Sequence, residues 1–162
     1  QPFEGQHQRF HETTSGSLSA AASQIKSAQK HKLTFTLVLI DIRQFHQINA
    51  RYGYIVGNNI LVTLASRLNS ISDIKQVART NGKQFTLITH AHNKDFNREA
   101  FIGNLLHLSS QPFSIGHQII SINPCIGFAD FSNSMMTSDE LMLKAEQSLA
   151  NAREKNLAYL AE

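Results

Sequence analysis

Apolar and polar residues follow two different periods along the chain, and these periods predict helices and strands in alternation. Residues 14–30 predict a helix, because small and apolar side chains recur there at helical spacing, at Leu18, Ala22, Ile25 and Ala28. Residues 32–41 are β-branched, aromatic and almost entirely apolar, which is typical of a central strand covered on both faces. A helix and a buried strand are therefore expected first.

Two helices are expected after this strand, a short one over residues 44–50 and a longer one over residues 58–68. The longer segment carries a single apolar stripe, and an amide side chain at its start can cap it, either Asn58 or Asn59. Gly53 and Gly57 are expected to bracket the turn between the two helices.

A β-hairpin is the sharpest local prediction. Residues 76–80 and 83–89 resemble strands, and Asn81-Gly82 separates them. A type I′ turn needs positive φ at both central positions, and Asn and Gly adopt that conformation at the lowest cost. We therefore expect a tight two-residue turn.

The remaining segments continue the alternation, with a helix over residues 95–108, a second hairpin over 111–128 turning near Gly116-His117, and a last helix over 138–155. Ser138, followed by two acidic residues, is the expected capped start of the last helix.

Length and composition describe one ordinary globular domain. The chain has 162 residues, of which 41% are hydrophobic and 17% charged, and no repeat or linker divides it. We expect a single α+β domain over residues 1–162, with an N-terminal segment and helix (1–30) and a core (32–162). Because the chain begins with Gln1, we expect a piece of a longer protein.

Charge, cysteine content and hydropathy exclude several classes of function. The formal net charge is +3, but the basic residues are scattered, so no nucleic-acid partner is expected. The single cysteine, Cys125, excludes an internal disulfide framework and a multi-cysteine metal site. The longest apolar run, residues 35–40, is too short to span a bilayer, so this domain is not expected to insert directly into a membrane.

Candidate chemistry begins at Asp41, which ends the buried strand. A carboxylate there lies where open sheets place ligands, although it could also cap the helix expected from Gln44. The string DIRQFHQINARYGYIVGN over residues 41–58 resembles the DxDxFKxxND-(Y/F)GHxxGD segment of GGDEF domains, the diguanylate cyclases. The turn Asn81-Gly82-Lys83-Gln84-Phe85 falls where that family has its GG(D/E)EF signature.

Weaker matches follow the family's order: the opening residues 2–9, the strand over 121–129 and the helix over 145–153. The resemblance therefore covers nearly the whole chain. It implies a central five-stranded sheet flanked by helices, with the signature turn on a β-hairpin.

The resemblance also implies an activity and a site. Family members join two GTP molecules, held on two facing domains, into cyclic di-GMP, and they need a divalent metal. The correspondence assigns the metal to Asp41 and Lys83, guanine to Asn49 and Asn58, and phosphate to His46 and Arg153. The vestigial nucleotide-binding residues are then Asp41, Ile42, Phe45, His46, Asn49, Asn58 and Arg153.

Several of these positions have lost the family's chemistry. Lys83 places an ammonium where the family has a metal-binding carboxylate, and Gln84 replaces the acidic residue that follows. Asn58 replaces an Asp and His46 replaces a Lys, so contacts to guanine and phosphate are weakened. The residues where the family has its RxxD product-inhibition motif, 72–75, do not match it. We predict no catalytic residues, no metal, and loss of magnesium binding.

The resemblance then implies a non-catalytic regulatory domain of a cyclic di-GMP signalling protein. Its expected partners are other domains of the same chain, such as an EAL phosphodiesterase domain, or a separate signalling protein, with weak GTP binding as a further option. A cytoplasmic location is expected, with any membrane anchor elsewhere in the full-length protein. The alternative is an active diguanylate cyclase with a non-standard site.

Lys83 and Asp41 are expected to come from adjacent strands. An unpaired Asp41 would bear a desolvation penalty, so we expect Lys83 to point toward it, directly or through water, as a substitute for the metal cation. That pairing would close the pocket to metal-bound GTP. In the alternative, the pocket stays open, Lys83 meets a phosphate, and Asn49 and Asn58 hold guanine weakly.

Overall fold

A computed structural model describes residues 10–11, 14–80, 82–132 and 135–160. Its five-stranded sheet has the order β1-β3-β4-β2-β7, in which only the β1–β3 pair is parallel. The predicted α+β class and five-stranded sheet are confirmed. The strand bounds are β1 Phe10–His11, β2 Phe35–Ile42, β3 Ile74–Thr80, β4 Gln84–Thr89 and β7 Pro124–Phe131.

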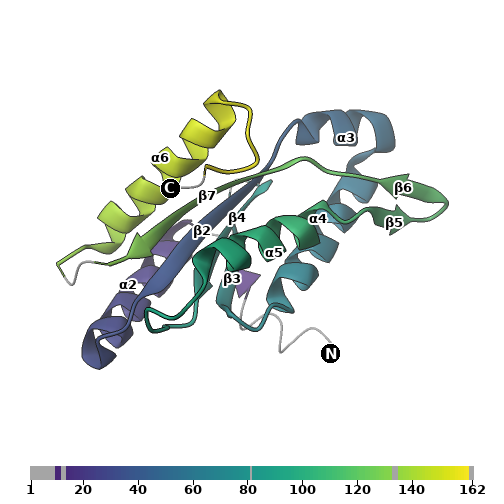
Figure 1. The fold of residues 1–162 in the computed structure, drawn as a ribbon. Helices are drawn as coiled ribbons and strands as arrows, with labels where there is room; N and C mark the ends of the chain where they lie inside the picture. Colours follow the sequence, from purple (N-terminus) through teal and green to yellow (C-terminus); the bar gives the residue numbers. More distant parts are fainter. Residues whose placement is uncertain (1–9, 12–13, 81, 133–134, 161–162) are drawn as a thin grey trace.

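The central strand β2 is buried along all eight residues, as its apolar sequence predicts. Leu37 and Leu39 pack toward α2 (Thr14–His31) and α6 (Ser138–Glu154), whereas Val38 and Ile40 lie in the core beneath α4 (Tyr54–Asn69) and α5 (Arg98–Ser110). Figure 1 shows α6 on the opposite side of the sheet from α4 and α5. Alternate residues of β2 therefore pack into two separate hydrophobic cores, one on each face of the sheet.

The strand β7 and the helix α6 approach each other closely at Gly127. A Cβ atom at this position would lie 2.3 Å from the Leu149 backbone nitrogen and 2.6 Å from the Ala145 carbonyl oxygen. Next to this contact, the Phe128 backbone N–H donates to the Ser148 hydroxyl at 3.1 Å. The absence of a side chain at Gly127 thus lets the α6 backbone lie directly on the sheet.

The predicted turn between Gly53 and Gly57 is wrong. The short helix α3 (Phe45–Tyr52) is followed at once by α4, which begins at Tyr54, so Gly57 lies inside a helix. Gly53 alone makes the change of direction, with φ of +90°. It is also the N-cap of α4, and the expected cap at Asn58 or Asn59 is not used.

The second hairpin is shorter than predicted. It consists of β5 (Phe113–Ile115) and β6 (Gln118–Ile120), with Gly116 at φ of +62° in the expected turn. Figure 1 shows this hairpin extending beyond the main sheet. The strand β7 is a separate element, because all eight residues of β2 pair with it and this pairing buries its apolar side chains.

The cap of α6 is one residue earlier than predicted. Thr137, not Ser138, is the N-cap, and its hydroxyl accepts from the Glu140 backbone N–H at 3.2 Å. The Glu140 carboxylate in turn accepts from the Thr137 backbone N–H at 3.1 Å. This capping box satisfies two backbone donors of the first turn, which a cap at Ser138 would not.

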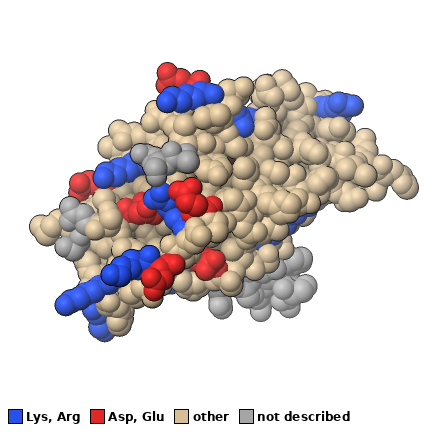
Figure 2. All heavy atoms as spheres, viewed as in Figure 1, with Lys and Arg blue, Asp and Glu red and all other residues tan. Residues whose placement is uncertain are grey.

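Charged side chains are dispersed on the face drawn in Figure 2. Among the described residues of that face, Lys and Arg form separate groups, several of them beside acidic side chains. No helix within the described ranges combines the length and apolar character needed to cross a membrane.

The Gly127 contact predicts a strong effect of one methyl group. Gly127→Ala should lower the free energy of unfolding by about 2–3 kcal/mol, because the clash is with backbone atoms that cannot rotate away. Gly103→Ala in α5 is the matched control: its Cβ meets nothing within 4 Å, and alanine should be neutral or stabilise by up to about 1 kcal/mol. Urea unfolding measures both, and equal stabilities of the two variants would contradict the close-packing argument.

Candidate functional site

Two neighbouring cavities lie at the end of β2 and share Lys83 in their linings. One, the cationic cavity, has a volume of about 460 Å³. It is lined by Asp41, Arg43, Gln44, Lys83, Gln84, Asn123, Arg153 and Asn156. The other, the amide cavity, has a volume of about 560 Å³. It is lined by Phe45, His46, Asn49, Tyr54, Asn58, Leu61, Arg79, Gly82 and Lys83.

The structure brings together most of the predicted site residues, but divides them between the two cavities. Asp41 and Arg153 lie in the cationic cavity, and Phe45, His46, Asn49 and Asn58 lie in the amide cavity. Ile42 lines neither; its side chain is fully buried in the core with α4 and α5.

Asp41 pairs with Arg153, and the prediction that it pairs directly with Lys83 is wrong. A guanidinium nitrogen of Arg153 lies 3.0 Å from the Asp41 carboxylate, whose side chain is only 8% exposed. Among the described residues no ion pair joins Asp41 to Lys83. The strand register explains this result: Asp41 faces Gln84, and its side chain lies on the α6 side of the sheet.

Asp41 does not cap the following helix. The N-cap of α3 is Gln44, in a left-handed conformation with φ of +56°, and no side-chain hydrogen bond caps this end. The Asp41 carboxylate thus makes no capping bond to α3 and lines the cationic cavity instead.

The signature turn (residues 81–85) lies on the β3–β4 hairpin, but its loop is one residue longer than predicted. Thr80 pairs with Gln84, which leaves residues 81–83 as the connection. Gly82 has the expected positive φ, +74°, whereas Asn81 lies outside the described residues. The Lys83 carbonyl accepts from the Ile42 backbone N–H at 3.4 Å, so Lys83 remains anchored beside the end of β2.

Arg43 is a site residue that the sequence reasoning missed. Its guanidinium donates to the Asn156 and Asn123 side-chain oxygens at 3.1 and 3.3 Å and to the Pro124 carbonyl at 3.4 Å. These partners come from two distant parts of the chain, residues 123–124 and Asn156, so only the position of Arg43 two residues beyond Asp41 hinted at a role. With Arg43, Lys83, Arg153 and Asp41, the cationic cavity carries a net formal charge of +2.

Cys125 lies opposite Asp41 in the β2–β7 register and is fully buried. Burial raises the pKa of its thiol, and the nearby Arg43 and Arg153 guanidinium groups partly offset that rise. The thiol donates to the Leu157 carbonyl at 3.4 Å. Cys125 is thus a neutral packing residue beneath the cavity, not a nucleophile.

The cationic cavity does not fit a divalent metal. Magnesium prefers several oxygen ligands, usually carboxylates, whereas this cavity offers one carboxylate that already binds a guanidinium. In the described part of the chain, no three His, Cys, Asp or Glu residues cluster in a way that could hold a metal ion.

The amide cavity depends on Gly57. A Cβ atom there would lie 2.0 Å from the Asn49 side-chain oxygen and 3.3 Å from the Phe45 ring. Gly57, which lies inside α4 and not in the expected turn, therefore leaves the space that the Asn49 amide occupies. Asn58 lines the same cavity. These two amides supply donors and acceptors beside apolar walls from Phe45 and Leu61.

The comparison with protein families settles the relationship. The model described as "Diguanylate cyclase, GGDEF domain" matches residues 17–157, which is most of the chain. The chain belongs to the GGDEF family. The resemblance seen in the sequence is thereby confirmed, and so is membership of a cyclic di-GMP signalling family.

Curated relatives of this GGDEF domain are much longer proteins. The bifunctional diguanylate cyclase/cyclic di-GMP phosphodiesterase MucR of Pseudomonas aeruginosa is 25% identical over 132 residues, which cover 81% of this chain and 19% of MucR. The signaling protein YkoW of Bacillus subtilis is 28% identical over 79% of this chain and 16% of its own length. This chain thus spans less than a fifth of either relative.

Solved GGDEF structures have the same fold. The GGDEF domain of TpbB (YfiN) from Pseudomonas aeruginosa superimposes with a TM-score of 0.83 at 20% identity, covering 94% of this chain and 91% of that one. The active GGEEF domain of a diguanylate cyclase from Vibrio cholerae gives 0.80 at 17% identity, covering 95% and 99%. At such identities the likeness concerns the fold.

The Asp41–Arg153 pair predicts a measurable coupling. Arg153→Ala should lower the free energy of unfolding by about 1 kcal/mol, because it leaves a buried carboxylate without its cation, and partial exposure of Arg153 limits the loss. In an Asp41→Asn background the same change should cost little. Lys155→Ala, two residues further on, is the matched control and should be neutral in both backgrounds. A coupling energy of zero in this double-mutant cycle would contradict a stabilising ion pair.

Proposed function

We propose that this GGDEF domain is non-catalytic and regulates an output domain of a cyclic di-GMP signalling protein. The observation that supports this proposal is the Asp41–Arg153 ion pair beside Lys83. The carboxylate at the family's metal position holds a guanidinium of its own chain, and the second metal position carries an ammonium.

The electrostatic cost of a metal in this cavity is large. A cation about 4 Å from a divalent ion is repelled by about 4 kcal/mol per unit charge of the ion at an effective dielectric of 20. Lys83 and Arg153 would both act in this way, and binding to Asp41 would first require breaking its pair with Arg153. Phosphoryl transfer between two polyanionic nucleotides depends on such an ion to neutralise developing charge. Lys83 and Arg153 thus oppose the binding of the divalent ion that phosphoryl transfer requires.

The length of the relatives supports the proposed regulatory role. MucR carries phosphodiesterase as well as cyclase in its name and is about five times the length matched here. By analogy, we propose that this domain tunes an attached output domain, of the EAL phosphodiesterase type, through protein contacts.

An active cyclase is the second candidate, favoured by the names of several relatives. The diguanylate cyclase DgcZ of Escherichia coli is 36% identical over 73 residues, 44% of this chain. Such an activity would need a site in which neither Lys83 nor Arg153 opposes the metal.

The proposal predicts that the domain forms no cyclic di-GMP from GTP with either magnesium or manganese. Chromatography with mass detection of the product measures this, with the active GGEEF domain from Vibrio cholerae as positive control. Product above the level without enzyme, abolished by Asp41→Ala, would overturn the proposal and establish the second candidate.

A further inference from the structure

We propose that the β5–β6 hairpin binds an extended, acidic peptide segment of a partner protein, which adds as a third strand along the outer edge of β6. The partner segment would lie in a groove between this edge and the helix α3. The inference goes beyond the proposed function, because it assigns a separate protein-binding surface and does not require that the domain be non-catalytic. The Asp41–Arg153 pair and Lys83 take no part in it.

The first support is a row of backbone groups that the hairpin leaves unpaired. The turn has two residues, with Gly116 at φ of +62°, and Ile115 faces Gln118 across it. The pair next to such a turn exchanges two hydrogen bonds and the following pair exchanges none, so Ile119 directs its N–H and C=O away from β5. Within the described ranges, no backbone hydrogen bond joins Ile119 or Ser121 to another element. An edge of this kind can accept a further strand.

The second support is that the sequence does not protect this edge. Proteins commonly block a strand edge with a lysine, a proline or an inward-pointing charge. Residues 118–122 read QIISI and contain none of these. Ile119 is also 74% exposed, which is unusual for a large apolar side chain in this domain. A partner strand would cover Ile119 together with the backbone groups beside it.

The third support is a groove that lies along the edge, here called the edge groove, with a volume of about 250 Å³. On the helix side it is lined by Gln47, Ile48, Arg51 and Tyr52 of α3, and on the hairpin side by residues 119–123. Five consecutive residues of an extended segment can line one groove only along the backbone edge, because their side chains alternate between two faces. Toward β7 the groove ends where the Arg43 backbone N–H donates to the Asn123 carbonyl at 2.9 Å.

The charge of the edge groove determines which kind of segment fits it. Residues 42–72 and 100–129 contain no Asp or Glu, and these two stretches supply the whole lining. Arg51 is exposed and lies over the Tyr52 ring, with 5.3 Å between its guanidinium carbon and the ring centroid. A carboxylate of the partner would therefore meet Arg51 without competition from an acidic side chain of the lining.

A second copy of this chain fits the edge less well than an acidic segment. Pairing of two β6 edges about a twofold axis would bring two surfaces without carboxylates against each other. The two Arg51 side chains would then repel, whereas an acidic strand would be attracted. Self-association through this edge is therefore an outcome that the test must distinguish.

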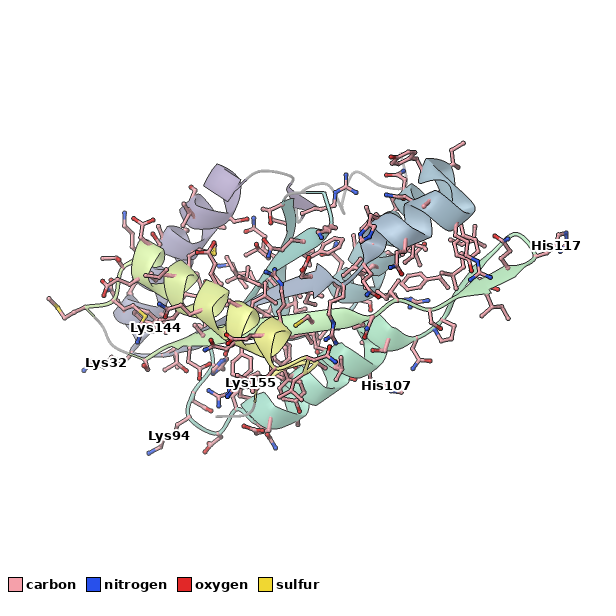
Figure 3. The ribbon with its side chains drawn as sticks, turned by 90° about the horizontal axis from the view of Figure 1, so that it is seen from above. Lys32, Lys94, His107, His117, Lys144 and Lys155 are labelled. Atoms are coloured by element: carbon pink, nitrogen blue, oxygen red, sulfur yellow. The ribbon has the colours of Figure 1, made fainter. Side chains whose placement is uncertain are left out.

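Selection of random peptides displayed on phage against the whole chain supplies the probe. The Arg51→Glu variant is the counter-target, and because Arg51 is exposed, this charge reversal should leave the core intact. Lys144→Glu is the matched control, with the same change in net charge. Figure 3 shows His117 at the tip of the hairpin and Lys144 on α6, toward the opposite end of the molecule.

We expect the chain to enrich acidic peptides that lack proline. Fluorescence anisotropy of a labelled enriched peptide should show at least about tenfold weaker binding to Arg51→Glu, and a change within about twofold for Lys144→Glu. Methylation of every second peptide nitrogen should abolish binding in one phase, where the N–H groups face the edge, and be tolerated in the other.

Hydrogen exchange of the unaltered chain provides a measurement that does not depend on any variant. The amide hydrogens of Ile119 and Ser121 should exchange rapidly in the free chain and slowly when the peptide is bound.

Four results would each overturn the inference: no peptide enriched over the bare support, enrichment of neutral or basic peptides, equal binding of peptides methylated in either phase, or self-association that protects the Ile119 and Ser121 amides. Formation of cyclic di-GMP by the same chain would overturn the proposed function and leave this inference standing. The two failures are therefore distinguishable.

Discussion

The buried carboxylate of Asp41 is the constraint on which the site depends. It lies one residue before the end of β2, a strand that is covered on both faces, and a buried carboxylate there needs a positive partner. Arg153 supplies that partner from the last turn of α6. The position of α6 on the sheet therefore determines whether the charge of Asp41 is neutralised. Arg43, Lys83 and the polar side chains around them are arranged about a pair that is already neutral.

The elements determined by local sequence were predicted well. The apolar run of β2 correctly indicated burial on both faces, and Gly82 and Gly116 correctly marked turns, because each signal is carried by a few consecutive residues. The errors concern choices made by distant partners. The strand β7 was merged with the second hairpin because only its pairing with β2 separates the two. Gly57 was taken for a turn because nothing in its neighbourhood shows that Asn49 needs the space.

The same distinction applies to the candidate site. The family motif correctly brought Asp41, Arg153, Asn49 and Asn58 into one region, because motif positions encode the fold as a whole. It could not show which cation reaches Asp41, since that depends on the direction of a side chain relative to the strand register. It also could not reveal Arg43, whose partners Asn123 and Asn156 lie 80 and 113 residues further along the chain. The loss of a family carboxylate at position 83 was visible in the sequence. That Arg153 supplies the positive partner of the remaining carboxylate, Asp41, was not.

The contact at Gly127 has a consequence for how accurately the cavity is built. The backbone of α6 rests on the strand at Ala145 and Leu149, so at this point no side chain separates the helix from the sheet and any sliding of the helix would bring backbone atoms into collision. One residue of helical rise is about 1.5 Å, half of the 3.0 Å between Arg153 and Asp41. Even that small translation would carry the guanidinium out of register with its carboxylate. The mechanical precision of a charged site at the rim is therefore determined by a residue without a side chain in the interior of the sheet.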